Sequence, residues 1–168
     1  MSIENGNERA LAFHEAGHCW GFWYTGRRFR YTTLRPRIAG YDAVTVAQRE
    51  WWFDELHPAA VVAVCGPLVE ILHLGKAHRG NTPRQRREVV EAGAQHDIAK
   101  IKHIQEEEGQ LQFLFRQVRA HWAGITQIAD ELLELKTLKS PRVFEILDDS
   151  DPGVRDYSSM LRIPSTMF

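Results

Sequence analysis

Apolar residues dominate the first patterned stretch of the chain, ALAFHEAGHCWGFWY at residues 10–24. Their run predicts one helix from Glu8 to Tyr24. Asparagine is a favoured N-cap and glycine a favoured residue just past a helix end. We therefore expect Asn5 or Asn7 to begin this helix and Gly26 to stop it.

The pattern then changes to one that is typical of β-structure. Tyr31–Leu34 and Ala43–Val46 are rich in β-branched and aromatic residues, and turn formers separate them at Pro36, Gly40 and Asp42. These two runs predict a small antiparallel sheet.

A second helix is predicted at Pro58–Leu74, because a proline is favoured in the first turn of a helix and Pro58 would begin this one. The residues of this helix are apolar on almost all of its faces. A helix without a polar face belongs in a core, so we expect this one to be central. No apolar run approaches the ~20 residues that are needed to span a bilayer, so we expect no transmembrane segment.

The second half of the chain predicts further helices. Amphipathic spacing, with Leu114, Val118 and Ile125 among the apolar positions, predicts a long helix at Gln110–Leu135. The other expected elements are a polar loop at Gly75–Pro83, a helix at Arg84–Glu107, a short helix at Ser140–Leu147 and an irregular tail at Asp148–Phe168. The expected fold class is mostly α with a small antiparallel β-sheet, as a single domain over residues 1–168 with its core at about 8–147.

Composition and charge narrow the class of partner. Apolar residues make up 43% of the 168 residues, which is typical of one globular domain, and 21 Lys and Arg balance 22 Asp and Glu. That balance gives no reason to expect nucleic acid or a membrane as a partner, and the basic clusters Arg27–Arg30, Arg35–Arg37 and Arg84–Arg87 are interpreted as solvated loops. Without a signal-peptide pattern, and with only Cys19 and Cys65, we expect buried thiols and a cytoplasmic protein.

The segment HEAGH carries the candidate chemistry. His14 and His18 are four residues apart, so a helix places both imidazoles on one face, close enough to share one zinc ion. Glu15 then points beside the metal, where it can take a proton from an attacking water. The alternative is a surface pair with Glu15 solvated, which fits poorly with so apolar a helix.

A catalytic zinc needs a third protein ligand. The metzincin pattern would place a histidine at position 24, where this chain has Tyr24, so that class is unexpected. Spacing alone leaves several candidates open. The first choices are Glu70, Asp97 and His57, and the weaker options are His73, His78, His96, His103 and His121.

Several segments together resemble the peptidase domain of the FtsH family of ATP-dependent zinc metalloproteases. HEAGH is the usual spelling of the motif in that family. The other matching segments, in the family's order, are Thr33–Arg37 with Gly40, Cys65–Glu70, Gly93–Ile98 and the expected closing helix at Ile128–Leu138. Their shared order over residues 8 to 147 implies an FtsH peptidase-like helical metalloprotease domain.

The resemblance implies a role for each site residue. His14, His18 and Asp97 would bind zinc, and Glu15 would be the general base. Glu70 would orient a ligand histidine, as carboxylates near metal ligands commonly do. The strand at Ala43–Val46 would bind polypeptide substrate as an added strand.

Two departures from the family limit what is carried over. His96 replaces the usual asparagine before Asp97, where it either hydrogen-bonds that aspartate, competes for the metal or faces solvent. The 168 residues also contain no GxxxxGK[ST] phosphate loop, and we expect no membrane-spanning helix among them. We therefore expect a stand-alone zinc endopeptidase that cuts unfolded or flexible polypeptides, or one that receives its substrate from a separate delivery protein.

Other functions stay open at this stage. The chain is alternatively a non-catalytic, metal-stabilised regulatory module or an adaptor of an ATP-dependent protease, although a structural zinc would not need Glu15. A protease with a single repressor-like target is a third reading. Monomer, dimer and hexamer all fit the sequence, so a homo-oligomer is one of the expected states.

Overall fold

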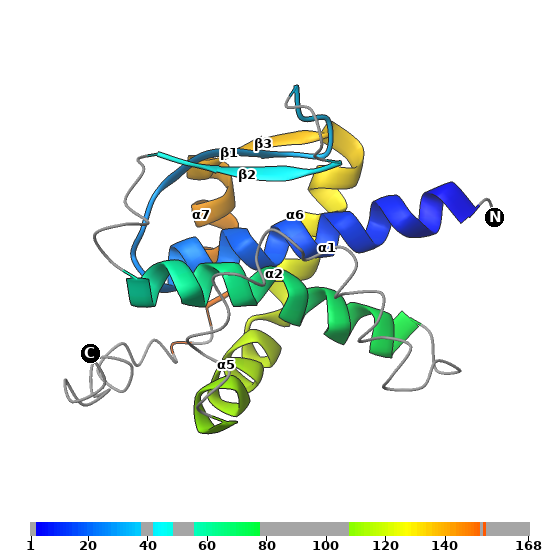
Figure 1. Cartoon of the computed structure of the whole chain (residues 1–168). Coiled ribbons are helices and arrows are strands. Elements are labelled where there is room, and N and C mark those ends of the chain that lie inside the picture. Colours follow the sequence, from blue (N-terminus) through cyan, green and yellow to red (C-terminus); the bar gives the residue numbers. More distant parts are fainter. Residues whose placement is uncertain (1–2, 38–41, 49–55, 78–107, 152, 154–168) are drawn as a thin grey trace.

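The computed structural model describes residues 3–37, 42–48, 56–77, 108–151 and 153. Most of them are helical, and three short strands form one antiparallel sheet, so the predicted coarse fold class is confirmed. Helix α1 (Ile3–Tyr24) lies between the sheet on one side and helix α2 (Leu56–Ala77) on the other (Figure 1). The expected helix Arg84–Glu107 and most of the expected tail fall outside the described residues.

Helix α1 is longer than the sequence pattern predicts. It begins at Ile3, so neither Asn5 nor Asn7 is its N-cap. Its end is as predicted, because Gly26 has a φ of +69° and donates its backbone N–H to the carbonyl of Trp23. The next N–H, of Arg27, bonds the carbonyl of Phe22, and this pair of bonds is the Schellman motif that glycine favours.

The sheet has the strand order β2-β1-β3. Strands β1 (Phe29–Thr33) and β2 (Val44–Ala47) are the two predicted strands, each shifted by one or two residues. Strand β3 (Thr137–Lys139) was not predicted, and it pairs antiparallel with β1 on the side opposite β2. Its residues include the end of the expected closing helix, which the structure therefore shortens.

That helix, α6 (Trp122–Leu135), stops because Lys136 adopts a left-handed conformation with a φ of +62°. The backbone N–H of Lys136 caps the helix by bonding the carbonyl of Leu132. Its own carbonyl accepts a bond from the backbone of Leu34, so the turn passes directly into the sheet. The predicted helix end at Leu135 is therefore confirmed, whereas the closing helix expected from the resemblance, to Leu138, runs three residues too far.

The predicted helix Gln110–Leu135 is two helices. Helix α5 (Glu108–Ala120) ends just before His121, and α6 begins just after it. The His121 ring is fully buried and donates its Nδ1 proton to the carbonyl of Gln117 at 2.8 Å. The backbone N–H of His121 bonds the same carbonyl at 3.1 Å, and the break lies at the φ of −96° and ψ of 15° that His121 adopts.

Helix α2 is buried, as its apolar sequence predicts. It runs from Leu56 to Ala77, so the first residues of the expected loop at 75–83 are helical. By length and composition the window Pro58–Gly75 would be long and apolar enough to cross a membrane, which corrects the expectation that no such run exists. Within the structure 78% of that window is buried, and the core helix of a folded domain passes the same test.

Most buried apolar side chains belong to one cluster. Helix α1 contributes the largest of them, including Trp20, Phe22 and Tyr24, and α2, α6 and α7 (Ser140–Asp149) pack around these. The last helix starts with Pro141 in its first turn and matches the predicted Ser140–Leu147 within two residues. The described core therefore has α1, which carries the HEAGH segment, at its centre.

Candidate metal centre

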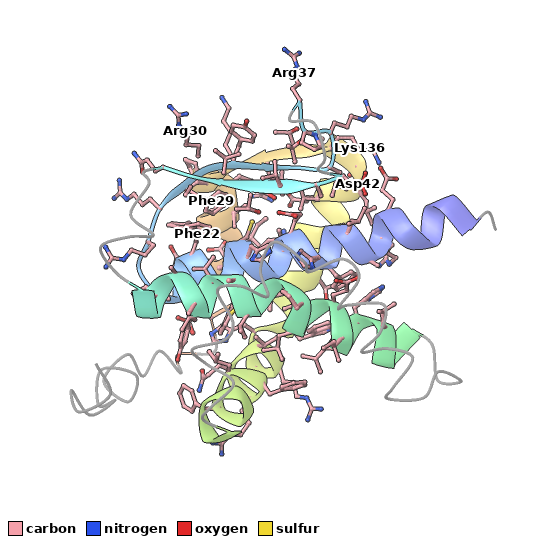
Figure 2. All side chains as sticks on the ribbon, viewed as in Figure 1. Phe22, Phe29, Arg30, Arg37, Asp42 and Lys136 are labelled. Carbon is pink, nitrogen blue, oxygen red and sulfur yellow. The ribbon has the colours of Figure 1, made fainter. Side chains whose placement is uncertain are left out.

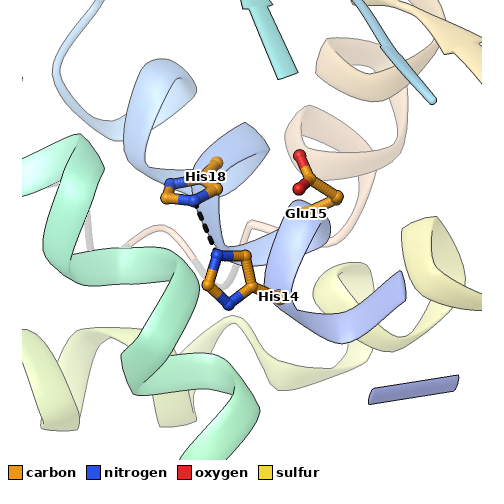
Figure 3. Close-up of side chains that lie close together, drawn as sticks. All are labelled: His14, Glu15 and His18. Carbon is orange, nitrogen blue, oxygen red and sulfur yellow. Dashed lines mark hydrogen bonds between the residues drawn. The ribbon is translucent and has the colours of Figure 1, made fainter. Parts of the chain in front are cut away.

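The HEAGH segment lies in the middle of α1, with its two histidines facing α2. His14 and Glu15 are buried and His18 is partly buried. One potential ligand atom from each of the three residues lies within 4.8 Å of the others (Figure 3). Among the described residues this is the group of histidine, cysteine and carboxylate side chains whose ligand atoms are close enough together that it could hold a metal ion.

Glu70 of α2 orients His14. Its Oε2 lies 2.8 Å from Nδ1 of His14, and both side chains are buried. A carboxylate accepts hydrogen bonds, so Nδ1 carries the proton, and in the neutral ring Nε2 presents a lone pair. The contact leaves that carboxylate on the Nδ1 side of the ring, away from Nε2.

A backbone carbonyl of α2 orients His18. Its Nδ1 lies 2.8 Å from the oxygen of Val62, and a carbonyl oxygen is an acceptor. Nδ1 of His18 is therefore also protonated, and in the neutral ring its Nε2 is also a lone-pair nitrogen. Metal-bound histidines commonly give their second ring N–H to a carboxylate or a carbonyl, and the two rings here show one case of each.

The two lone-pair nitrogens face each other. Nε2 of His14 lies 3.0 Å from Nε2 of His18, and the ring planes are 75° apart (Figure 3). Two neutral acceptors repel at that distance unless a proton or a cation lies between them. Zn²⁺ with bonds of about 2.0–2.1 Å and tetrahedral angles separates neighbouring ligand atoms by roughly 3.3 Å, so the histidine pair fits such an ion.

Glycines bring the backbone of α2 against the histidines. A Cβ on Gly66 would overlap the ring of His18 and would lie 2.9 Å from Nε2 of His14. On the other helix, a Cβ on Gly17 would overlap the carbonyl of Cys65. The close approach of α1 and α2 therefore requires a glycine at position 17, and the position of the two histidine rings requires one at position 66.

The sheet holds Glu15 from the opposite side of α1. Its Oε2 accepts a hydrogen bond of 2.6 Å from the hydroxyl of Thr45 on β2. That hydroxyl also lies 2.9 Å from Oγ1 of Thr32, which is paired with Thr45 across β1 and β2 and is fully buried. The carboxylate is thus fixed by a strand, while the histidines are fixed by a helix.

Cys19 closes this side of the site. Its Sγ lies 3.9 Å from Oγ1 of Thr45. Burial raises the pKa of the Cys19 thiol well above its usual range, and the nearby charge of Glu15 raises it further. Burial raises the pKa of Cys65 in the same way, and both residues are buried free cysteines, as predicted. Neutral thiols of this kind pack as small apolar groups.

The structure narrows the choice of a third ligand. The His73 ring stacks on Phe13 with 3.9 Å between ring centroids, and His121 lies among Trp20 and Trp23, so neither belongs to the group around His14. The side chain of His57 and the whole of Asp97, His78, His96 and His103 lie outside the described residues. Asp97 therefore remains the ligand that the resemblance predicts.

Sequence reasoning missed three groups that shape the site. Gly66 and the Val62 carbonyl precede the predicted Glu70 on the same helix, but a backbone acceptor leaves no sequence signal. Thr45 lay in a predicted strand that was interpreted only as a substrate-binding element. A threonine at an inward-facing position of that strand was the available signal for a partner of Glu15.

The chain matches no model of a known protein family and no curated protein.

Proposed function

We propose that the chain is a zinc-dependent metallo-endopeptidase that hydrolyses peptide bonds of unfolded or flexible polypeptides. The observation that carries the proposal is the opposed pair of Nε2 atoms on His14 and His18, 3.0 Å apart, with both Nδ1 atoms engaged by acceptors. A buried carboxylate in the same group adds the third element that hydrolysis needs.

His14 and His18 would bind zinc through Nε2, and Asp97 would complete the protein ligands. Glu70 and the Val62 carbonyl would keep the two rings in the tautomer that binds metal. Three protein ligands leave one position of a tetrahedral ion open, which distinguishes a catalytic zinc from a structural one.

Glu15 would act as the general base. When bound, zinc polarises a peptide carbonyl and lowers the pKa of water. Glu15 would receive the proton of the attacking water at Oε1, because its Oε2 is engaged by Thr45. A base that is held on one oxygen keeps the other at a fixed position relative to the histidines, which supports proton transfer rather than metal binding.

Strand β2 supplies a place for the substrate backbone. Within the described residues β2 pairs with β1 on one side and has no strand on its other side. An extended polypeptide added to that edge would be held by main-chain hydrogen bonds, which tolerate many sequences. Such a substrate must already be unfolded, or a separate protein must deliver it.

Measuring the metal content tests whether the zinc site exists, and measuring cleavage tests whether that site is catalytic. Protein expressed with added zinc should contain about one zinc per chain by elemental analysis. His14→Gln and His18→Gln should lose it, whereas His121→Gln, which changes a buried histidine outside the group, should retain it. Less than about half an equivalent in the wild type would overturn the metal site.

Glu15→Gln should retain zinc and lose cleavage of an unfolded casein-like substrate. The loss should be at least about a hundredfold in rate, the lower end of what general bases contribute. If wild type and Glu15→Gln both bind zinc and are equally inert on a broad peptide library, the protein is instead a metal-stabilised regulatory module.

A further inference from the structure

The outer face of the sheet gathers basic side chains from three places in the sequence. Arg28 and Arg30 lie at the start of β1, Arg35 and Arg37 follow its end, and Lys139 ends β3. All five are exposed. The predicted clusters at Arg27–Arg30 and Arg35–Arg37 thus supply four of these five exposed cations.

The strand register places this charge on the side away from the metal centre. Tyr31 pairs with Val46 on one neighbour and with Lys139 on the other, so the three share a face. The next pairs along, which contain Thr32, face the opposite way, toward Glu15. Arg30 and Arg37 project from the sheet away from α1, whereas Phe29 lies between the sheet and the helix (Figure 2).

The positive charge of this face is not neutralised by neighbours. Arg28, Arg30, Arg35, Arg37 and Lys139 take part in no ion pair in the part of the chain that the structure describes. From residue 25 to residue 48 the sequence has five arginines and a single acidic residue, Asp42. The whole chain has a formal charge of −1, so the excess of acidic residues lies elsewhere.

We propose that this face binds an acidic segment of a polypeptide in an extended conformation. A sheet of three strands is roughly 10 Å across, and a five-residue strand is about 17 Å long, which matches an extended segment of about five residues. Acidic side chains on alternate residues of such a segment would all point to one face, toward the arginines. Tyr31, which is 37% exposed between them, offers an apolar contact in the same row.

A long polyanion fits less well than a short acidic segment. It would extend beyond the sheet onto a molecule with excess negative charge, and repulsion there would offset the attraction at the arginines. The surface also has one exposed aromatic ring among the described residues of the sheet, whereas single-stranded nucleic acid binders stack successive bases on several. The inference rests on the charge and register of the sheet, and it holds whether or not the metal centre is catalytic.

The test is fluorescence anisotropy with a labelled ten-residue peptide of alternating Glu and Val, checked by mass spectrometry to remain intact. The same peptide with Gln in place of Glu is the uncharged control. Wild-type protein should bind the acidic peptide at least about tenfold more tightly, and the difference should shrink as salt rises to about 1 M, where charges are screened within roughly 3 Å.

Arg30→Glu combined with Lys139→Glu should weaken acidic-peptide binding about tenfold, since two attractions become two repulsions. Arg116→Glu combined with Arg119→Glu, on the exposed side of α5, changes the net charge equally and should leave binding within about twofold. Circular dichroism shows whether the first variant is folded. If it is not, Arg35→Glu combined with Arg37→Glu is a second test, at the other end of β1.

Equal binding by wild type and by the folded sheet variants would overturn the proposal. So would at least tenfold tighter binding of a ten-residue oligothymidylate than of the acidic peptide, which would make the face a nucleic-acid site. Preferential binding to vesicles with anionic lipid over the acidic peptide would overturn it in favour of a membrane surface.

Discussion

The backbone of Gly66 lies against the ring of His18, so closely that a methyl group at position 66 would overlap Nε2 of that ring. The glycine belongs to α2 and the histidine to α1, so the position of Nε2 of His18 depends on both helices. A side chain at position 66 would therefore displace the His18 ring.

Gly66→Ala should reduce zinc affinity by at least about tenfold, because the new Cβ displaces His18 or occupies the position of the ion. Isothermal titration with zinc measures the change, and the melting temperature of the metal-free protein reports any damage to packing. Pro58→Ala, about two turns earlier on the same helix, is the matched control and should bind zinc as the wild type does. Unchanged affinity in Gly66→Ala would place the metal elsewhere.

Glu70→Ala should weaken zinc binding about 10- to 100-fold, the usual effect of removing a residue that orients a metal ligand. Glu70→Gln should weaken it less, since an amide oxygen still accepts the Nδ1 proton of His14. Asp97→Ala should have a larger effect than either, because it would remove a ligand. Glu134→Ala, an exposed carboxylate on α6, is the control. A larger loss in Glu70→Ala than in Asp97→Ala would contradict the choice of third ligand.

Thr45→Val should lower the rate of peptide cleavage about 10- to 100-fold, since a hydrogen bond to a charged group is worth roughly 1.5–3 kcal/mol. The valine has nearly the same shape but cannot hold Oε2 of Glu15. Thr45→Ser should retain most of the rate because it keeps the hydroxyl. Zinc content should be unchanged in both variants. If Thr45→Val cleaves as fast as wild type, the contact with β2 does not position the base.

The pair of Glu131 and Arg142 makes a separate prediction about pH. Hydrogen bonding from Arg142 lowers the pKa of Glu131 below its usual range, and the Oε1 contact is 2.6 Å. Its contribution to the free energy of unfolding is therefore present above the unfolded pKa of about 4.3 and is lost as the pH falls through the lower folded value.

Arg142→Gln should accordingly be less stable than wild type near neutral pH, and the two should converge in acid. Urea unfolding at a series of pH values measures both curves. Arg116→Gln, an exposed arginine with no ion pair in the described chain, should differ from wild type by an amount that does not depend on pH. A constant difference for Arg142→Gln would contradict the lowered pKa of Glu131.

Periodicity and end signals predicted the long elements of the fold well. Helix α1 and helix α2 were each found at the expected place, and Gly26 was recognised as a stop because its positive φ is a glycine preference. The failures lie where a side chain or a tertiary contact overrides the pattern. His121 breaks a helix whose apolar spacing continues across it, and Lys136 turns the chain into β3 without a glycine.

Only the part of the candidate site that lies on helix α1 could be predicted from the sequence. A four-residue spacing fixes the relation between His14 and His18, because both rings leave the same face. The partners that orient these rings come from α2, 44 and 56 residues further along the chain, and no local pattern relates them. The orienting role of Glu70 is implied by the family resemblance, whereas the contact of the Val62 carbonyl with His18 was not predicted.

Gly17, the second-last residue of HEAGH, sits at the crossing of α1 with α2, and Gly21 lies one turn later on the same side. A Cβ on Gly21 would meet Cα of Val62 at 3.0 Å, so both glycines keep the helices close together. The motif thus encodes a helix crossing as well as ligands. A HEAGH segment placed on a single helix of another protein would supply two imidazoles whose tautomers are not fixed. The transplanted unit would also have to include α2, which provides Glu70 and the Val62 carbonyl.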